Sequence, residues 1–323
     1  MKIYRSLDEV PGDFGPCALT IGNFDGVHFG HRHILRKLKS TALAYGWKAS
    51  ALTFDPHPTR VVAPERAPKL IYSPDMRAEL MGTEGIEQVL ILPFTRELAQ
   101  CTPEQFVESL ITQRLQARVV FVGDNFHFGH KQSGNVHVLA ELGRQFGFET
   151  VVVPAVQCRG RMVSSSVIRQ LISAGRVAQA ARLLERPYSL DGEVVSGRGV
   201  GSKQTVPTLN LATEQQLIPE RGVYVTRTHD LDSQRQWPSI SNIGYRPTFG
   251  TSEELSIETF LLEPLSGEDP RRIRVELLWR VRDERKFESP EALKSQIFRD
   301  VRVAQNYFRR VRAWVGRVPC TSS

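Results

Sequence analysis

Long hydrophobic runs are missing from this sequence of 323 residues. No apolar stretch approaches the roughly 18 consecutive residues that a membrane-spanning helix needs. The first residues, MKIYRSLDEVPGDFG, carry charges where a signal peptide would have an apolar core. We therefore expect a protein that is neither inserted into a membrane nor exported.

Cysteine is scarce, and its spacing is wide. The four cysteines are Cys17, Cys101, Cys158 and Cys320, and no two of them form a CxxC pair. This spacing fits neither a zinc ribbon nor a disulfide framework, because both need closely spaced cysteines. The simplest prediction is a reducing, cytoplasmic location.

Compositional bias is also absent. Charged residues make up 24% of the chain and hydrophobic residues 41%, and no internal repeat or low-complexity segment is visible. These values are ordinary for globular proteins and argue against a mainly disordered or fibrous chain. At about 150 residues per domain, the length predicts two domains.

The net charge of +7 is concentrated near the end of the sequence. Residues 271–318 contain 14 Lys and Arg against 6 Asp and Glu. Such a stretch can bind nucleic acid, can surround a phosphate-rich small substrate, or, most commonly, is a solvated helix face. Because no interleaved aromatic pattern favours single-stranded nucleic acid, we predict no nucleic-acid partner. The rival class, a nucleic-acid-binding protein, would show salt-sensitive binding to polynucleotide.

The first 185 residues alternate short apolar runs with amphipathic stretches. Residues 31–45 have helical periodicity, and Thr102-Pro103-Glu104-Gln105 has the pattern of a capped helix start. This alternation predicts a doubly wound α/β domain over residues 1–185, with ligands bound at the carboxyl ends of its strands. The runs that read as buried parallel strands are Cys17–Ile21, Ser50–Phe54, Gln88–Leu92, Val119–Val122 and Thr150–Val153.

After residue 185 the pattern changes to short strands between turns rich in Gly and Pro. This pattern is typical of an antiparallel barrel. Ser289-Pro290-Glu291 caps a final amphipathic helix. We therefore predict a second domain over residues 186–318, a small antiparallel β-barrel with a C-terminal helix. Its predicted strands are Leu190–Val195, Thr208–Leu211, Gly222–Thr228, Ile257–Leu262 and Ile273–Leu278.

The strongest local motif is GNFDGVHFGH, which spans residues 22–31 between a predicted strand and a predicted helix. Free N–H groups at a helix start bind phosphate oxygens. His28 and His31 are three residues apart and so share one helix face, while Gly30 lets a ligand approach the backbone. Two imidazole donors there suit the negative charge of a phosphate transition state. Zinc binding, for which no further ligand is evident nearby, and chance placement are the alternatives.

Three later segments of the first half fit the same site. TFDPHP (53–58) and GDNFHFG (123–129) each follow a predicted strand, and SSSVIR (164–169) opens a predicted helix. Hydroxyls at a helix start, with an arginine one turn further, form an anion site, although simple N-capping also explains the serines. Phe126 and Phe128 either stack on a planar ring or fill the core.

The second half carries a different set of polar residues. The glycine-rich segment 197–203 has neither P-loop nor GxGxxG spacing and alone predicts a flexible turn. Thr208 and Asn210 share one face of a predicted strand, and their oxygens suit Mg²⁺, although an ordinary polar strand face is the alternative. Glu258 lies in another predicted strand, where a carboxylate either faces solvent or accepts a proton from an attacking hydroxyl.

Taken in order, the motifs of residues 1–185 resemble those of the FMN adenylyltransferase module of bacterial bifunctional riboflavin kinase/FAD synthetases. GNFDGVHFGH is similar to the HxGH signature of nucleotidylyltransferases. The resemblance implies attack of the FMN phosphate on the α-phosphorus of ATP, giving FAD and pyrophosphate. His127 and Gln132 depart from the family pattern, in which arginine is usual. The implied residues are His28 and His31 for catalysis, Asn23, Gly30, Ser165, Ser166 and Arg169 for ATP, and Asn125, Phe126 and Phe128 for the flavin.

The second half resembles the riboflavin kinase module of the same family from about residue 187 to residue 307. The resemblance implies that Thr208 and Asn210 bind Mg²⁺ with ATP. It also implies that Glu258 activates the ribityl 5′-hydroxyl of riboflavin for attack on the γ-phosphorus. Ser202 and Thr205 depart from the pattern, in which arginine and glycine are usual. The segments that carry the resemblance are PTLN (207–210), GVY (222–224), IGYRPTF (243–249), ETF (258–260) and RDERKF (282–287).

The resemblance therefore implies a two-domain flavin cofactor synthase. Its substrates are the small molecules riboflavin, FMN and ATP, its cofactor is Mg²⁺, and its products are FMN and FAD. Neither step needs a covalent enzyme intermediate, in agreement with the absence of an obvious activated cysteine or serine. The alternative is a nucleotidylyltransferase of another substrate class with a non-catalytic barrel. No oligomeric state is predicted.

Overall fold

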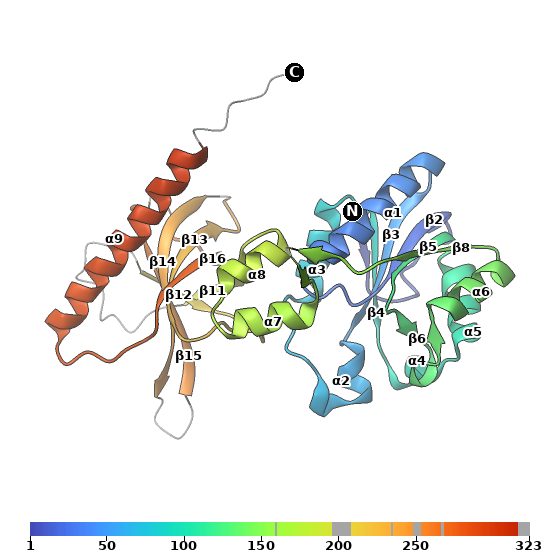
Figure 1. Ribbon diagram of the computed structural model, residues 1–323, viewed down its shortest axis with the longest axis horizontal. Coiled ribbons are helices and arrows are strands. Elements are labelled where there is room, and N and C mark those ends of the chain that lie inside the picture. Colours follow the sequence, from blue (N-terminus) through green and yellow to red (C-terminus); the bar gives the residue numbers. More distant parts are fainter. Residues whose placement is uncertain (159, 196–207, 234, 248–252, 266–267, 316–323) are drawn as a thin grey trace, which may run out of the picture. The chain divides into compact units, whose positions relative to one another are not determined.

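The chain forms two compact units, Met1–Val167 and Ile168–Ser323 (Figure 1). The domain boundary predicted at residue 185 stays a prediction. The predictions for the segment 197–203, for Thr205 and for residues 248–249 concern positions outside the described residues. The computed structural model describes residues 1–158, 160–195, 208–233, 235–247, 253–265 and 268–315.

The first unit is built on a six-stranded parallel sheet with the strand order β1-β4-β3-β2-β5-β8. The order reverses between β2 and β5, which makes that point the topological switch of the sheet. All five predicted strands are confirmed, and β1 adds a short edge strand. The bounds are β1 Lys2–Tyr4, β2 Cys17–Ile21, β3 Lys48–Asp55, β4 Gln88–Pro93, β5 Ala117–Gly123 and β8 Glu149–Val153.

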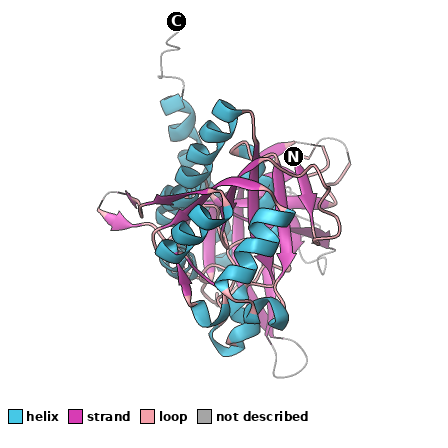
Figure 2. Cartoon of the chain, turned by 90° about the vertical axis from the view of Figure 1, so that its right-hand side faces the viewer, coloured by secondary structure: helices cyan, strands magenta, loops and turns pink. Residues whose placement is uncertain are grey.

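Helices cover both faces of this sheet (Figures 1 and 2). Helices α1 (Phe29–Tyr45) and α3 (Pro74–Thr83) contribute to one hydrophobic cluster. The π-helical segment η2 (Phe106–Arg114) and α6 (Val136–Phe146) contribute to the other. The predicted doubly wound α/β domain is therefore confirmed. The shorter elements are α2 (Pro58–Val62), η1 (Pro64–Arg66), α4 (Arg96–Gln100), α5 (Pro103–Gln105), β6 (His127–Phe128), η3 (His130–Gln132), β7 (Gly134–Asn135), β9 (Gln157–Cys158) and β10 (Arg161–Met162).

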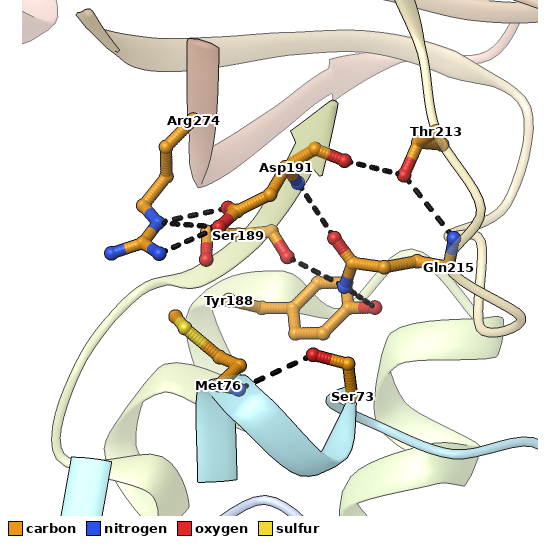
Figure 3. Close-up of polar contacts among 8 residues, drawn as sticks. All are labelled: Ser73, Met76, Tyr188, Ser189, Asp191, Thr213, Gln215 and Arg274. Carbon is orange, nitrogen blue, oxygen red and sulfur yellow. Dashed lines mark hydrogen bonds and ion pairs between the residues drawn. The ribbon is translucent and has the colours of Figure 1, made fainter. Parts of the chain in front are cut away.

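Capping residues set where two of these helices begin. The predicted capping box forms at α5, where Thr102 Oγ1 accepts the N–H of Gln105 at 3.2 Å and Gln105 Oε1 accepts the N–H of Thr102 at 3.0 Å. At α3, Ser73 Oγ accepts the N–H of Met76 at 3.2 Å (Figure 3). Helix α3 was not predicted, because its buried face carries Arg77 where an apolar residue would give the helical pattern.

The second unit is a closed antiparallel barrel with the strand order β11-β12-β15-β14-β13-β16. Helix α7 (Ser165–Ser173) begins in the first unit, and α8 (Val177–Leu184) packs on β11 and β16. Helix α9 (Pro290–Val315) packs on β13 and β14, which confirms the predicted barrel with its C-terminal helix. The strand bounds are β11 Tyr188–Val195, β12 Thr208–Ala212, β13 Gly222–Asp230, β14 Gln236–Pro247, β15 Glu253–Leu261 and β16 Arg272–Arg282.

Strand β14 was not predicted, and its buried residues explain why. Ser239 and Ser241 are at most 1% exposed and take part in a chain of hydroxyl hydrogen bonds of 2.8–2.9 Å with Thr226, Thr228 and Thr259. Buried hydroxyls are tolerated because they are hydrogen-bonded to one another. The strand therefore lacks the alternating apolar residues on which strand prediction depends.

A polar network joins the first strand of the barrel to the last (Figure 3). Gln215 Oε1 accepts the N–H of Asp191 at 2.6 Å, and its Nε2 donates to the carbonyl of Ser189 at 3.1 Å. Thr213 Oγ1 donates to the carbonyl of Asp191 at 2.7 Å. Arg274 donates to the Asp191 carboxylate through Nε at 2.8 Å and Nη2 at 2.6 Å. These contacts fix β11 to β16 and to the segment after β12.

Gly192 in β11 leaves no room for a side chain. A Cβ atom there would lie 1.9 Å from the backbone oxygen of Ala212. Because this contact is with the backbone, no side-chain rotation relieves it. We expect Gly192→Ala to lower the free energy of unfolding of the barrel by about 2–3 kcal/mol, measured by urea unfolding. Gly12→Ala is the control, since nothing lies within 4 Å of a Cβ at Gly12. An unchanged midpoint in Gly192→Ala would contradict this expectation.

None of the helices within the described residues combines the length and the hydrophobicity that crossing a bilayer would require.

Candidate functional site

The loop of residues 22–28, here called the histidine loop, connects the carboxyl end of β2 to the start of α1, beside the switch point of the sheet. His28 is the N-cap of α1, and its Nδ1 accepts the N–H of His31 at 3.4 Å. His28 therefore precedes the helix rather than lying within it. The expected proximity nevertheless holds, since the two rings stack with centroids 3.7 Å apart at an interplanar angle of 16°.

The neighbours of the two rings restrict how they can move. His28 is only 5% exposed. A Cβ atom at Gly30 would lie 3.3 Å from the His28 ring and 3.3 Å from Cγ2 of Val156, so a side chain larger than hydrogen would press on both. The ring of Phe24 meets His31 edge-on at a centroid distance of 5.2 Å. The imidazoles are thus held in place beside a helix start, as donors to a transition state must be.

Asp25 anchors the same loop to two other segments. Its carboxylate accepts the N–H of Ile71 at 3.0 Å and the N–H of Tyr72 at 3.3 Å. Its backbone carbonyl accepts a hydrogen bond from Ser165 Oγ at 2.9 Å. The structure therefore brings Ser165, a predicted ATP-binding residue, to the histidine loop.

The other predicted residues of the SSSVIR segment occupy the first turns of α7. Ser164 Oγ accepts the N–H of Val167 at 3.3 Å, so Ser164 is the capping residue that the alternative interpretation expected. Ser166 is exposed and Arg169 is half-buried. Capping by Ser164 leaves the hydroxyl of Ser165 for the contact with the histidine loop.

Arg77 is a residue of this region that sequence analysis missed. Its Nη1 donates to the backbone carbonyl of Asn23 and, at 3.1 Å, to Thr53 Oγ1. Its Nη2 donates to the carbonyl of Phe54 at 3.2 Å. A charged residue four positions after the Ser73 cap was the available signal, but in the sequence alone such a residue is typical of a solvent-exposed helix face.

The residues predicted to contact a flavin follow β5, the strand beside β2. Asn125 is exposed in the loop, whereas Phe128 is 7% exposed and packs against Phe106 with centroids 5.7 Å apart. Phe126 stacks on Phe128 with centroids 5.5 Å apart. Phe128 therefore packs in the core beneath the loop, and a flavin contact by Asn125, Phe126 and Phe128 stays a prediction.

In the barrel, strand register places the predicted kinase residues side by side. Glu258 of β15 pairs with Asn210 of β12 on one side and with Asn242 of β14 on the other. Thr208 pairs with Phe260. Directly opposed residues have Cβ atoms about 4.5–5.5 Å apart, so Asn210, Glu258 and Asn242 form a row on one face of the sheet.

Residues of this row line two cavities. One, of about 690 Å³, is lined by Thr208 and Asn210 and by charged residues of both signs, which are Glu193, Asp232, Asp269, Arg271 and Arg272. The other, of about 320 Å³, is lined by Glu258 and continues to helix α9. Glu258 therefore faces the second cavity while its cross-strand neighbour Asn210 lines the first.

The wall of the second cavity is held by an ion pair. Arg282 donates to the Asp300 carboxylate of α9 through Nε at 3.0 Å and Nη2 at 2.7 Å. Gln296 Nε2 donates to the same carboxylate at 2.7 Å. The guanidinium carbon of Arg282 lies 5.8 Å from the ring centroid of Phe287, within cation–π range. Part of the basic stretch near the end of the sequence is therefore used to attach the RDERKF segment to α9.

Within the ranges that the structure describes, no group of three or more His, Cys, Asp and Glu side chains is placed to hold a metal ion.

Comparison with known proteins assigns each half of the chain separately. The sequence profile of FAD synthetase matches residues 11–167, and that of riboflavin kinase matches residues 184–308. A bifunctional riboflavin kinase/FMN adenylyltransferase from Pseudomonas fluorescens is 34% identical over 305 residues, covering 94% of this chain and 97% of that protein. The Escherichia coli K12 protein of the same description is 32% identical over 311 residues, covering 95% and 98%.

A solved structure shares the fold of this chain. The crystal structure of a macrolide-efflux protein from Streptococcus pneumoniae superposes with a TM-score of 0.83 at 27% identity, covering 94% of this chain and 98% of that one. This chain belongs to the family of bifunctional riboflavin kinases/FMN adenylyltransferases.

Proposed function

We propose that the barrel unit phosphorylates riboflavin to FMN and that the α/β unit then adenylylates FMN to FAD. The observation that carries this proposal is that one chain contains two separate sets of polar side chains suited to act on phosphate groups. One set is the stacked pair His28 and His31 at a helix start. The other is the cross-strand pair Asn210 and Glu258, which line two cavities.

In the adenylyl transfer, an oxygen of the FMN phosphate bonds to the α-phosphorus of ATP, and the bond from that phosphorus to the bridging oxygen breaks. Pyrophosphate leaves with the electron pair. His28 and His31 donate hydrogen bonds to the α-phosphate oxygens, on which negative charge grows. Asn23 and the backbone at Gly30 bind the phosphates beside them.

The remaining residues predicted for the adenylyltransferase bind the ends of the two substrates. Ser165, Ser166 and Arg169 hold the triphosphate, as hydroxyls and a guanidinium at a helix start can do. The hydrogen bond from Ser165 to the histidine loop supports this placement. Asn125 and Phe126 contact the flavin, and Phe128 supports Phe126 from the core.

In the phosphoryl transfer, Glu258 accepts the proton of the ribityl 5′-hydroxyl as that oxygen attacks the γ-phosphorus, and ADP leaves. Riboflavin occupies the cavity of about 320 Å³ that Glu258 lines, and ATP occupies the larger cavity on the side of Asn210. The register pairing of Glu258 with Asn210 brings the base next to the phosphates.

The larger cavity fits a magnesium ion by the chemistry of its donors. Thr208 and Asn210 supply hydroxyl and amide oxygens, and Glu193 and Asp269 add carboxylates to the same lining. Mg²⁺ prefers oxygen ligands and keeps several waters alongside substrate phosphates. When bound there, it neutralises charge on the transferred phosphoryl group.

We also propose that residues 1–185 and 186–318 are the two catalytic domains, that the enzyme works in the cytoplasm, and that its partners are small molecules and no nucleic acid. The first and second family profiles, which end at residue 167 and begin at residue 184, are compatible with such a division.

Isotopically labelled ATP tests the two reactions together. Purified protein receives riboflavin, Mg²⁺ and ATP labelled at either the α- or the γ-phosphorus, and flavins are separated by chromatography over time. We expect FMN to appear first and to carry only the γ label, and FAD to appear later and to carry both. FAD without α label, or riboflavin left unphosphorylated, would refute the proposal.

A further inference from the structure

The histidine loop has a backbone conformation that needs support from other parts of the unit. Phe24 and Val27 have positive φ angles of 48° and 39°. Residues with a side chain rarely adopt this region, and a β-branched residue such as valine does so least readily. Such conformations persist only where the surrounding structure fixes them. The groups that fix this loop therefore determine where its phosphate-binding atoms lie.

Arg77 contacts this loop at its first turn. Its guanidinium joins the carbonyl of Asn23, which follows β2, to Thr53 and Phe54, at the end of β3. Thr53 Oγ1 also donates to the Asn23 carbonyl at 3.3 Å. One side chain thus holds together the carboxyl ends of two neighbouring parallel strands, where ligands of doubly wound folds bind.

The burial of Arg77 shows that its charge is not there for solubility. The side chain is 0% exposed. Burial lowers the pKa of the guanidinium, while the charges of Asp25 and Asp55 act in the opposite direction. Burying a charge costs free energy unless hydrogen bonds or opposite charges compensate for it. An apolar side chain would therefore be buried here at a lower cost in free energy. The planar fork of arginine reaches several acceptors at once, which lysine, as a point charge, does not reproduce.

We propose that Arg77 is a positioning residue of the adenylyltransferase, which fixes the loop from Asn23 to His28 in the conformation that binds the phosphates of ATP. Arg77 acts through the Asn23 carbonyl and is too deeply buried to touch ATP itself. This inference rests on the proposed adenylyltransferase function of the first unit.

The test compares Arg77→Met, Arg77→Lys and a matched control, Met81→Ala. Met81 lies on the same helix and is also 0% exposed, but it belongs to the hydrophobic cluster and not to the loop contacts. For each full-length variant we measure the KM for ATP and the kcat of FAD formation from FMN, the Kd for ATP without FMN, the Tm, and the rate of FMN formation from riboflavin.

We expect Arg77→Met to raise the KM and the Kd for ATP at least about 10-fold, the effect of losing hydrogen bonds to a charged group. Arg77→Lys should give a smaller rise, and both should leave FMN formation unchanged. Met81→Ala should lower the Tm with an unchanged KM for ATP. If Arg77→Met does not fold, the KM rise in Arg77→Lys decides.

The inference is overturned if the Arg77 variants lower only the Tm, as the control is expected to do, or if they lower kcat while the KM for ATP stays at the wild-type value. This result differs from failure of the proposed function, in which wild-type protein itself would form no FAD from FMN and ATP.

Discussion

His31→Ala is expected to stop the product series at FMN. The imidazole of His31 stacks on that of His28 at 3.7 Å beside the start of α1, so its removal takes away both a donor and the packing partner of the second donor. Loss of one preorganised donor to a transition-state oxygen typically costs about 10²–10³ in kcat. The measurement is FAD formation from FMN and ATP, with FMN formation from riboflavin assayed in the same preparation.

His33→Ala is the matched control for this experiment. His33 lies on the same helix two residues further and takes no part in the stacked pair. We expect it to form FAD at the rate of the wild-type protein. If His31→Ala also formed FAD at the rate of the wild-type protein, the paired imidazoles would not act on ATP.

Glu258→Gln is expected to abolish FMN formation from riboflavin while leaving FAD formation from added FMN intact. The amide keeps the size of the side chain but accepts a proton poorly, so a riboflavin kinase that uses Glu258 as its base should lose about 10²–10⁴ in kcat. The α/β unit does not contain this residue, and FAD formation from added FMN should continue at the wild-type rate. Both rates are measured by chromatography of the flavins.

Glu254→Gln separates this effect from a general loss of charge on β15. Glu254 is exposed, lies on the same strand and lines neither of the two described cavities. Its variant should keep both activities. Unimpaired FMN formation by Glu258→Gln would show that Glu258 is not the base of the kinase. The alternative of a nucleotidylyltransferase with a non-catalytic barrel instead expects no FMN formation even by the wild-type protein.

The sequence was most informative where local pattern and tertiary role agree. The predicted strand at Cys17–Ile21 has its predicted bounds, because all five residues are buried and apolar or hydrogen-bonded in the middle of the sheet. The predicted helix after Ser289-Pro290 is likewise present as α9. In both cases the residues that form the element are also the residues that pack it.

Prediction failed where a buried position is polar. Strand β14 was missed because its buried residues include Ser239 and Ser241, whose hydroxyls are both hydrogen-bonded to Thr226 of β13. Helix α3 was missed because Arg77 occupies its buried face. Such positions depend on partners that are distant in the sequence, and local periodicity carries no information about them.

At the candidate sites, too, the sequence did not reveal contacts between residues that are far apart in the chain. The proximity of His28 to His31 followed from their spacing, but His28 proved to be the cap of the helix, a distinction that depends on its backbone angles. The pairing of Glu258 with Asn210 joins residues that are 48 positions apart, and only the strand register places them together. The sequence indicated the residue types, and the fold brought them to one place.

Complementation between two inactive variants tests the central claim, that one chain contains two independent active sites. His31→Ala and Glu258→Gln are each incubated with riboflavin, ATP and Mg²⁺, first separately and then mixed. We expect the first alone to give FMN, the second alone to leave riboflavin unchanged, and the mixture to form FAD, because FMN made by one protein serves the other. A mixture that forms no FAD, or a single variant that has lost both activities, would contradict the account.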